Sequence, residues 1–471
     1  MAKVHITGLE NQQTAPSFYL PNRVDVAVLT ELEKILGGSD SVTYMVEEVL
    51  APEPTVAKFL KKRRILSFNF RKANVKVLRE RLLDEMTQGR DVVFVPGRPN
   101  SIMGCMSDVP MPFMMQLAAL HISPVPVFVG HYRENILRAF TTDKTHDWAS
   151  LCILPKLSPG PLTGERVLEA WMEASCTEFE RNPILDVSLA RLLVEGMRRH
   201  GKTQLVDGLD DSSLPFYKVL GVAMALAKEL KKIVQEPRLG VILPPGKGGV
   251  IANYACLLAG IVPVNINYTS SEPAFRSIVK QSGIKHFLTA RTFMSKLPQF
   301  PWPQGDAIIH LDKTLKGIGM AKIAGWVAFA RFAPMSIVSS TFNLDARKGD
   351  DEAALLFTSG SSGEPKGVVL SHRMVLANVA QCANRIPLKD EKFLASLPIF
   401  HSFGLTVTMM LPLLTGYSFC AYPNPTDARS LCDLCKRYDL TVVCATPTFA
   451  RAMLRRADKD TFKAVNYFIV G

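Results

Sequence analysis

The residues best suited to chemistry form a short run of glycines and hydroxyl side chains. The run is followed by Lys366-Gly367 and consists of Thr358, Ser359, Gly360, Ser361, Ser362 and Gly363. Glycine tolerates backbone angles that turn successive amide groups inward, and inward amides form a nest for an anion. The hydroxyl groups add hydrogen-bond donors, and Lys366 adds a full positive charge. The spacing therefore predicts a loop that holds phosphate groups.

Apolar stretches on both sides of this loop are predicted to be strands, over residues 353–357 and 368–370. A Walker loop has the spacing GxxxxGK[ST] and is followed by a helix, and neither condition holds here. A glycine–serine run by itself is typical of a linker. Flanking strands and the Pro-Lys-Gly exit favour a binding loop instead.

A repeating order of strand, helix and strand surrounds the loop. Amphipathic helices are predicted over 188–200 and 220–233. Further strands and helices are predicted over 238–243, 251–258, 262–265, 392–397, 405–414, 418–422, 431–438 and 441–444. Such an alternation predicts an α/β fold with a parallel, doubly wound sheet.

These features together resemble the adenylate-forming superfamily of acyl-CoA synthetases, luciferases and peptide-synthetase adenylation domains. Residues 358–367 match its Thr-Ser-Gly-Ser-Ser-Gly-x-Pro-Lys-Gly signature, and residues 398–404 match its Pro-x-Phe-His-x-x-Gly motif. Residues 239–268 resemble its early strand–helix–strand segment. The resemblance covers residues 185–471, which we interpret as an AMP-binding adenylation domain.

The resemblance implies an AMP-forming acid–thiol ligase that uses ATP and Mg²⁺. It implies that the loop of Thr358–Lys366 holds the β- and γ-phosphates, that Thr358 contacts the metal, and that His401 lies beside the acyl carboxylate. Lys366 and His401 are the implied catalytic residues. Coenzyme A or the pantetheine of an acyl carrier protein would then accept the acyl group.

The sequence stops at Gly471, at the end of the predicted strand 466–471. The superfamily's aromatic-Gly-x-Thr-Glu loop, its ribose-binding Asp and its small C-terminal domain with a catalytic Lys would follow this point. We therefore expect a fragment of a longer protein, in which the adenylation domain is truncated before its adenine loop.

Residues 1–180 also have an α/β pattern, with predicted strands over 91–96 and 125–129 and helices over 111–120 and 168–181. Residues 156–161 have the composition of a loop. Residues 4–11, 20–25 and 94–98 fall where a glycerolipid acyltransferase domain has its opening strand and its two motifs.

The match to the acyltransferase motifs is incomplete at the residues that do chemistry. Arg23 replaces the catalytic His, Val28 replaces its Asp partner, and Asp25 has the wrong spacing. Arg stays protonated and cannot act as the base. Gly97 follows Pro96 where a Glu is needed, so only Arg98 remains to bind phosphate. We interpret residues 1–180 as a non-catalytic acyltransferase-like domain.

An acyltransferase-like domain before an acyl activator is similar to the bifunctional acyl-acyl-carrier-protein synthetase / 2-acylglycerophosphoethanolamine acyltransferases. That resemblance implies a fatty acid substrate in fatty acid and phospholipid metabolism. Two alternatives stay open: a working lysophospholipid acyltransferase coupled to the activation, and a non-catalytic module that binds nucleotide or acyl chains.

Composition limits the partners and the compartment. The 471 residues carry a net charge of +12, which suits an anionic membrane or an acidic carrier protein. Nucleic acid is not expected, because no recognition-helix, zinc-finger or RNA-binding pattern occurs. Nine scattered cysteines favour a reducing cytoplasm. Peripheral attachment to the inner membrane is the alternative location, because residues 318–338 could form an interfacial amphipathic helix or a half-buried surface helix.

The Cys432–Cys435 pair forms one CxxC motif with no second pair and no histidine at metal-binding spacing. We interpret the pair as part of a helix face. The basic run Lys61-Lys62-Arg63-Arg64 is interpreted as a solvated surface segment.

Overall fold

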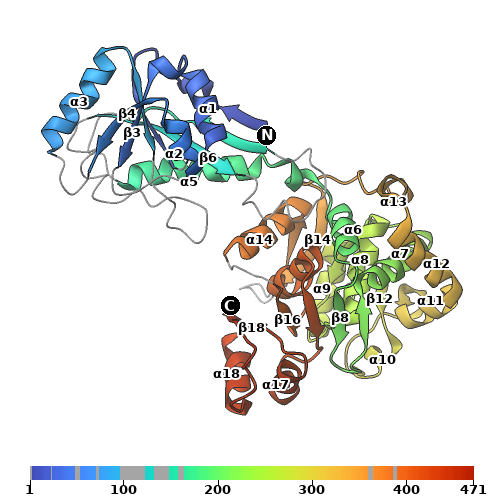
Figure 1. Ribbon diagram of the computed structural model, residues 1–471. Coiled ribbons are helices and arrows are strands. Elements are labelled where there is room, and N and C mark those ends of the chain that lie inside the picture. Colours follow the sequence, from blue (N-terminus) through green and yellow to red (C-terminus); the bar gives the residue numbers. More distant parts are fainter. Residues whose placement is uncertain are drawn as a thin grey trace. The chain divides into compact units, whose positions relative to one another are not determined.

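The computed structural model describes residues 3–22, 24–47, 54–69, 74–95, 122–131, 148–157, 164–358, 364–385 and 390–471. The chain divides into two compact units (Figure 1). Unit 1 consists of Met1–Arg138 and Asp143–Asn182, and unit 2 consists of Ala139–Thr142 and Pro183–Gly471. Each unit is described by itself.

Unit 1 is built on a sheet whose described strands have the order β1-β7-β6-β2-β5-β3-β4. β6 and β7 are antiparallel, and the other pairs are parallel. The strands are β1 (Lys3–Thr7), β2 (Phe18–Pro21), β3 (Val42–Glu47), β4 (Arg64–Phe68), β5 (Asp91–Val95), β6 (Val125–His131) and β7 (Trp148–Ile153). The helices are η1 (Leu9–Asn11), α1 (Val26–Ile35), η2 (Ser39–Ser41), α2 (Pro54–Leu60), α3 (Val75–Thr87) and α5 (Gly164–Glu180).

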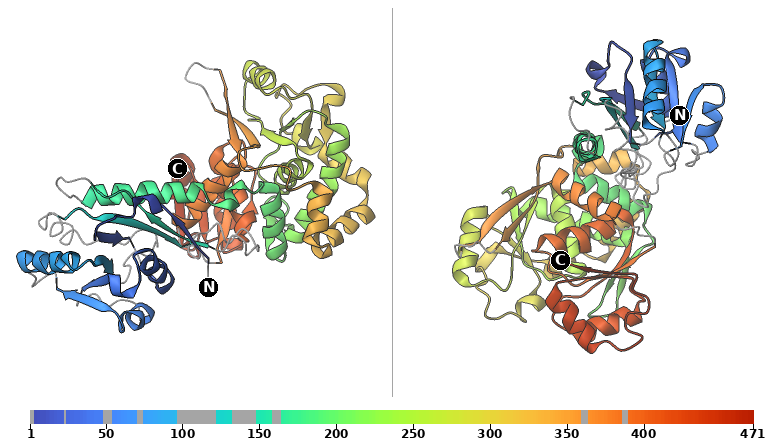
Figure 2. Two further views of the ribbon diagram at one scale, coloured as in Figure 1. Left: turned by 90° about the horizontal axis from the view of Figure 1, so that it is seen from above. Right: turned by 90° about the vertical axis from the view of Figure 1, so that its left-hand side faces the viewer.

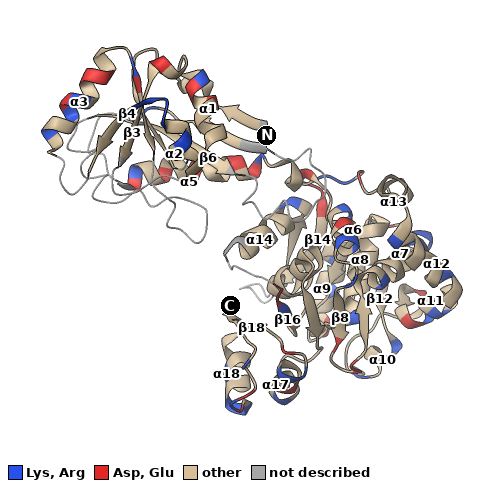
Figure 3. Ribbon diagram, in the orientation of Figure 1, with Lys and Arg blue, Asp and Glu red and all other residues tan. Residues whose placement is uncertain are grey.

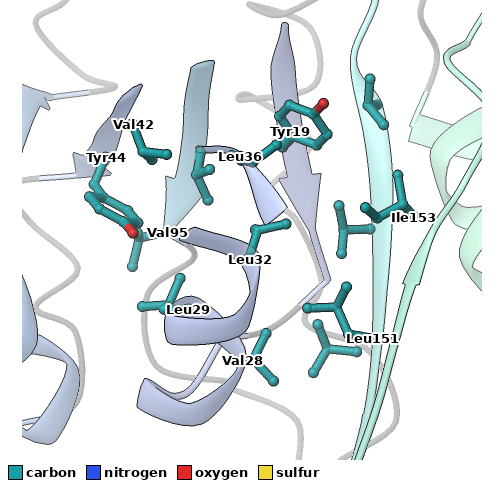
Figure 4. Close-up of a cluster of buried hydrophobic side chains, with 14 of the residues drawn as sticks. Tyr19, Val28, Leu29, Leu32, Leu36, Val42, Tyr44, Val95, Leu151 and Ile153 are labelled. Carbon is teal, nitrogen blue, oxygen red and sulfur yellow. The ribbon is translucent and has the colours of Figure 1, made fainter. Parts of the chain in front are cut away.

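Both faces of this sheet carry a buried core. On one face, α1 places Val28, Leu29 and Leu32 against side chains of the strands (Figure 4). On the other face, α3 contributes Leu78 and Leu82, and α5 contributes Val167, Trp171 and Ala174. The predicted α/β pattern of this segment is therefore confirmed for the part of the chain that the structure describes.

Individual predictions in unit 1 have mixed outcomes. The strands at 91–96 and 125–129 and the helix at 168–181 correspond to β5, β6 and α5. The opening strand of residues 4–11 was predicted too long, because β1 ends at Thr7 and Gly8 adopts a left-handed φ of 74°. A Cβ at Gly8 would lie 1.9 Å from the Ile153 carbonyl oxygen, so only glycine fits this turn. The predicted helix at 111–120 lies outside the described residues, as does most of the loop at 156–161.

Unit 2 contains two sheets rather than the one that the strand–helix rhythm suggested. Their orders are β13-β12-β10-β11-β14-β15 and β19-β18-β16-β17-β8-β9. The strands are β8 (Gln204–Asp207), β9 (Ser213–Pro215), β10 (Arg238–Val241), β11 (Val262–Asn265), β12 (Phe287–Thr289), β13 (Ile308–His310), β14 (Glu352–Thr358), β15 (Lys366–Ser371), β16 (Lys392–Ala395), β17 (Ser418–Ala421), β18 (Val442–Ala445) and β19 (Tyr467–Val470). Strand pairs in both sheets are parallel, as predicted, except β14–β15 and β8–β9.

Helices cover these sheets and lie between them. They are η6 (Pro183–Asp186), α6 (Leu189–Arg199), α7 (Phe216–Ile233), α8 (Lys247–Ala259), α9 (Glu272–Ser282), α10 (Arg291–Met294), η7 (Gly305–Ala307), α11 (Leu311–Ile318), α12 (Met320–Phe332), α13 (Met335–Phe342), α14 (His372–Arg385), α15 (Ser402–Leu405), the π-helix η8 (Thr406–Met410), α16 (Leu411–Thr415), α17 (Ala428–Arg437) and α18 (Pro447–Arg456). α17 and α18 pack together at the carboxyl end of the chain (Figures 1 and 2).

α8 joins the two sheets of unit 2. It contacts β10 and β11 of one sheet and β8 of the other. Its residues from Gly249 to Leu258 are all buried, as expected of an interior helix that is apolar on every side. Gly260 ends α8 with a φ of 72°, which confirms the predicted glycine C-cap.

Two sequence-based interpretations concern surface or cysteine-bearing helices. Residues 318–338 do not form one helix. Ile318 ends α11, Gly319 separates it from α12, and the chain leaves the helical conformation again at Ala333, where Pro334 caps α13. Across the described chain, no helix has the length and apolar character needed to span a bilayer. Cys432 and Cys435 lie on the buried face of α17, which confirms the helix-face interpretation.

Candidate active site

The predicted phosphate loop connects β14 to β15. These strands are antiparallel, and their register pairs Phe357 with Gly367 and Thr358 with Lys366. Residues directly opposite in an antiparallel pair point to the same face, with Cβ atoms about 5 Å apart. The side chains of Thr358 and Lys366 therefore leave the same face at the base of the loop, and both residues are exposed.

Five of the predicted loop residues lie outside the part of the chain that the structure describes. They are Ser359, Gly360, Ser361, Ser362 and Gly363. Gly367 is described, and a Cβ there would approach the Phe357 ring to 3.3 Å. Glycine at this position lets the ring of Phe357 lie over the strand, so the hairpin beneath the loop is closely packed. The binding roles of all these residues remain predictions.

The second predicted site residue, His401, follows β16 of the other sheet and caps the short helix α15. Its backbone N–H donates to the Pro398 carbonyl at 3.1 Å, which closes the turn. Gly404 lies against the same carbonyl, where a Cβ would be 2.0 Å from the oxygen. The Pro-x-Phe-His-x-x-Gly spacing thus has a steric reason: only glycine lets the helix begin so close to the turn that carries His401.

His401 is partly removed from water although the residue is exposed. Its imidazole lies 4.6 Å from the Phe400 ring, measured between centroids. Desolvation by the surrounding atoms lowers its pKa below the ordinary value of a histidine. The ring is therefore neutral at pH 7, with one nitrogen able to donate and the other able to accept a hydrogen bond.

An aromatic contact joins the two sheets of unit 2 beside His401. Tyr268 follows β11, and its ring meets the Phe400 ring edge to face at 5.1 Å between centroids. Tyr268 also contacts Phe293 at 5.2 Å. Burial raises the pKa of the Tyr268 hydroxyl to about 12. The carboxyl ends of β11 and β16, which belong to different sheets, therefore meet next to His401, where open α/β sheets bind ligands.

Within the described chain, no hydrogen bond or ion pair joins His401 to Thr358 or Lys366. The hairpin and His401 are placed by different sheets, and the distance between them is set by the sheet packing. Among the described residues, no cluster of three His, Cys, Asp or Glu side chains could hold a metal ion. Thr358 remains the predicted protein ligand for magnesium, with phosphate and water oxygens as the other ligands that this ion prefers.

Sequence reasoning missed residues that support the site rather than react in it. Asn253 of α8 and Asn265 of β11 are buried and exchange two amide hydrogen bonds, at 3.0 and 2.7 Å. The pair fixes α8 against the strand that leads to Tyr268. The pair could have been predicted from the sequence, because each asparagine lies on a predicted apolar element and buried amides need hydrogen-bond partners.

The comparisons with known proteins identify the class of this fold and site. Residues 195–471 match the family described as AMP-binding enzyme, and this match covers more than half of the chain. The chain belongs to this family, within the adenylate-forming superfamily.

Individual relatives are more distant. The chain is 26% identical over 273 residues to the long-chain-fatty-acid–CoA ligase of Bacillus subtilis, which covers 52% of this chain and 48% of that protein. It is 33% identical over 281 residues to 4-coumarate–CoA ligase-like 3 of Arabidopsis thaliana, covering 59% and 50%. The chain spans about half the length of the curated relatives it matches. Among solved structures, the inhibitor-bound N-terminal domain of FACL13 from Mycobacterium tuberculosis matches at a TM-score of 0.49 and 21% identity, covering 60% of this chain and 70% of that one.

Proposed function

We propose that this protein activates a carboxylic acid with ATP and transfers the acyl group to a thiol. Membership of the AMP-binding family supports the reaction class. The observation that carries the proposal is the strand register that sets Thr358 opposite Lys366 at the base of the glycine–serine loop. Such a hairpin holds a hydroxyl and a positive charge ready for a phosphate chain before the substrate arrives.

In the proposed reaction, a carboxylate oxygen attacks the α-phosphorus of ATP. The bond to the bridging oxygen breaks, and pyrophosphate leaves with the electron pair. Lys366 would offset the negative charge that develops on this leaving group. A bound Mg²⁺ would share that charge, with Thr358 as the proposed protein ligand. The neutral His401 would hold the carboxylate by a hydrogen bond without trapping it in an ion pair.

The proposed acid is a fatty acid, and the proposed acceptor is coenzyme A or the pantetheine of an acyl carrier protein. A long-chain-fatty-acid–CoA ligase among the relatives supports the fatty acid. The 4-coumarate–CoA ligases among them make an aromatic acid the substrate to test against it.

For unit 1 we propose a non-catalytic, acyltransferase-like domain. Val28 is fully buried in the core beneath α1, and the Asp25 carboxylate accepts from the Val28 N–H at 2.8 Å as the N-cap of that helix. Neither position therefore offers a free base for a glycerol hydroxyl. Arg23, Gly97 and Arg98 lie outside the described residues. Transfer of an acyl group to lysophosphatidylethanolamine by a fragment of residues 1–182 would contradict this proposal.

Exchange of labelled pyrophosphate into ATP tests the ligase proposal in the full-length protein. We expect exchange that depends on a long-chain fatty acid and is weaker with 4-coumarate. Lys366→Ala should lower the exchange rate by roughly 10²-fold, because one charge on the leaving group is lost. Lys280→Ala, on the exposed face of α9, is the matched control and should leave the rate unchanged. ATP binding without exchange for any acid would favour the nucleotide-binding module instead.

A further inference from the structure

Unit 2 carries an apolar surface segment that the proposed reaction does not use. Between Asp312 and Asp345 the sequence contains no acidic residue and four basic ones. α12 lies in this stretch and is mostly apolar, yet only Ala330 is buried among its residues. Met320 is 81% exposed and Phe332 is 73% exposed, and Ile337 of α13 is 49% exposed. Phe332 and Ile337 flank the break between α12 and α13, so large apolar side chains are exposed close together in the chain there, as at a surface that meets something apolar.

The inner face of α12 is firmly held, so its outer face is fixed in direction. A Cβ at Gly221 of α7 would lie 2.5 Å from the Val327 Cα, so the two helices cross in close contact. Trp326 meets the rings of Phe329 and Phe342 at 5.3 and 5.6 Å between centroids. The Lys228 amine donates to the Thr341 carbonyl at 2.8 Å. These contacts pack α12 and α13 against each other and against α7.

A basic pocket opens beside the same helices. It has a volume of about 800 Å³ and is lined by the ends of α6, α7 and α12 and by the start of α13. Its basic lining residues are Arg198, Arg199, Lys202 and Arg331, together with His200. Glu195 is the one carboxylate in this described lining, and it accepts from the Arg191 guanidinium at 3.1 Å.

The pocket and the apolar helices are one structural feature. The Arg198 guanidinium donates to the Ala333 carbonyl at 2.6 Å, at the break between α12 and α13. The Arg331 guanidinium lies 5.2 Å from the centre of the Tyr217 ring and 5.1 Å from that of Phe332. Burial lowers the pKa of both Arg198 and Arg199, and the nearby Glu195 carboxylate partly offsets this shift for Arg199. α12 itself shows basic and no acidic positions (Figure 3).

We propose that α12, α13 and the basic pocket form a docking surface for a membrane that contains anionic phospholipids. Exposed Met320, Phe332 and Ile337 would enter the boundary between headgroups and acyl chains. A lipid phosphate would occupy the pocket among Arg198, Arg199 and Lys202. Apolar insertion and basic residues together give stable peripheral binding, whereas either alone is weak. An acidic carrier protein would match the charges but would leave Phe332 and Met320 without an apolar partner.

Co-sedimentation of the full chain with lipid vesicles tests this surface. We expect binding to phosphatidylcholine vesicles that contain phosphatidylglycerol, little binding to phosphatidylcholine alone, and weaker binding at high salt. Lys202→Glu should weaken binding by about fivefold or more per unit of charge changed. Phe332→Ser should weaken it by roughly tenfold, because its ring no longer enters the interface. The matched controls are Leu454→Ser, a residue 59% exposed on α18, and Lys280→Glu, and both should bind as the unaltered chain does.

A second readout reports insertion directly. The fluorescence of Phe332→Trp should shift to the blue on anionic vesicles and stay unchanged on neutral ones. Equal binding to both vesicle types, or no effect of Lys202→Glu and Phe332→Ser, would overturn the inference. Binding of an acyl carrier protein that is lost in Lys202→Glu and kept in Phe332→Ser would assign the surface to a protein partner. Pyrophosphate exchange without vesicles is a separate measurement, so a failure of docking is distinguishable from a failure of the proposed ligase.

Discussion

At the scale of single residues, desolvation lowers the pKa of two histidines in unit 2, one exposed and one buried. His401 is exposed, and its lowered pKa favours the neutral ring that the proposed contact with a carboxylate needs. His372 is buried, and its Nδ1 accepts from the Leu189 N–H at 3.2 Å. Desolvation lowers the pKa of His372 to about 4, which makes this ring a structural acceptor between α14 and α6.

His372 should make the stability of unit 2 depend on pH. Its folded-state pKa of about 4 lies below the ordinary value of 6.5. Between pH 4 and pH 6.5, His372 therefore binds a proton in the unfolded chain but not in the folded one. The contribution of His372 is complete above pH 6.5 and is lost as the pH falls towards 4, by up to about 3 kcal/mol. Urea unfolding across this range should show a flatter pH dependence for His372→Asn, whose amide oxygen can replace Nδ1. An unchanged slope would contradict this assignment.

Gly404 is expected to tolerate no side chain. In Gly404→Ala the new methyl group would meet the Pro398 backbone carbonyl, which cannot rotate away. We expect a loss of about 1–3 kcal/mol in the free energy of unfolding, together with weaker acid-dependent exchange because the His401 turn is displaced. Gly317→Ala in α11 is the control: nothing lies within 4 Å of its Cβ position. Thermal unfolding of the two variants would decide the point, and equal melting temperatures would refute the steric explanation.

At the scale of elements, the site depends on how α8 is fixed to β11. The Asn253–Asn265 pair is buried, and Asn253 also donates to the Gly249 carbonyl at 2.9 Å. Gly249 in turn lies against Ile399, where a Cβ would come within 2.8 Å of the Ile399 side chain. One helix therefore connects the strand that leads to Tyr268 with the segment that carries His401.

A double-mutant cycle should reveal the coupling in this amide pair. Asn253→Ala and Asn265→Ala should each cost about 1–3 kcal/mol, because the partner amide is left buried without its hydrogen bonds. The double variant should cost less than the sum by about 1 kcal/mol, since the second change removes the group that the first one stranded. Urea unfolding measures all three variants. Strict additivity would show that the pair does not act as a unit.

At the scale of the whole molecule, the two units have separate buried cores. In unit 1 the core around α1 includes Leu32, which is 1% exposed. In unit 2, Leu226 of α7 is fully buried. The described members of these buried clusters belong to elements of a single unit in each case, and we expect each unit to lose stability separately.

Paired substitutions can test this independence. Leu32→Ala should destabilise unit 1 by about 2–5 kcal/mol through the cavity it leaves, and Leu226→Ala should do the same to unit 2. Hydrogen exchange followed by mass spectrometry reports on each unit in the intact chain. We expect faster exchange in the altered unit alone. Faster exchange in both units after Leu32→Ala would show that they unfold together.

Local features of the chain were predictable from short-range patterns. The alternation of strands and helices, the Gly260 C-cap and the buried face with Cys432 and Cys435 each depend on residues a few positions apart. A single helix was predicted over 318–338 from its apolar composition. The chain instead breaks before Pro334, which caps α13. Backbone sterics at one residue outweighed composition there.

The sequence by itself determined the family signature at residues 358–367 and the strands predicted on either side of it. The glycine–serine run and the apolar stretches beside it depend only on neighbouring positions, whereas the antiparallel register that sets Thr358 opposite Lys366 was seen only in the structure. The tertiary structure alone decided that Tyr268 would meet Phe400, since these residues belong to segments of different sheets. It also decided that α12 would turn Met320 and Phe332 outward. Local spacing fixes contacts within one turn or hairpin, whereas contacts between elements depend on which apolar faces pack together.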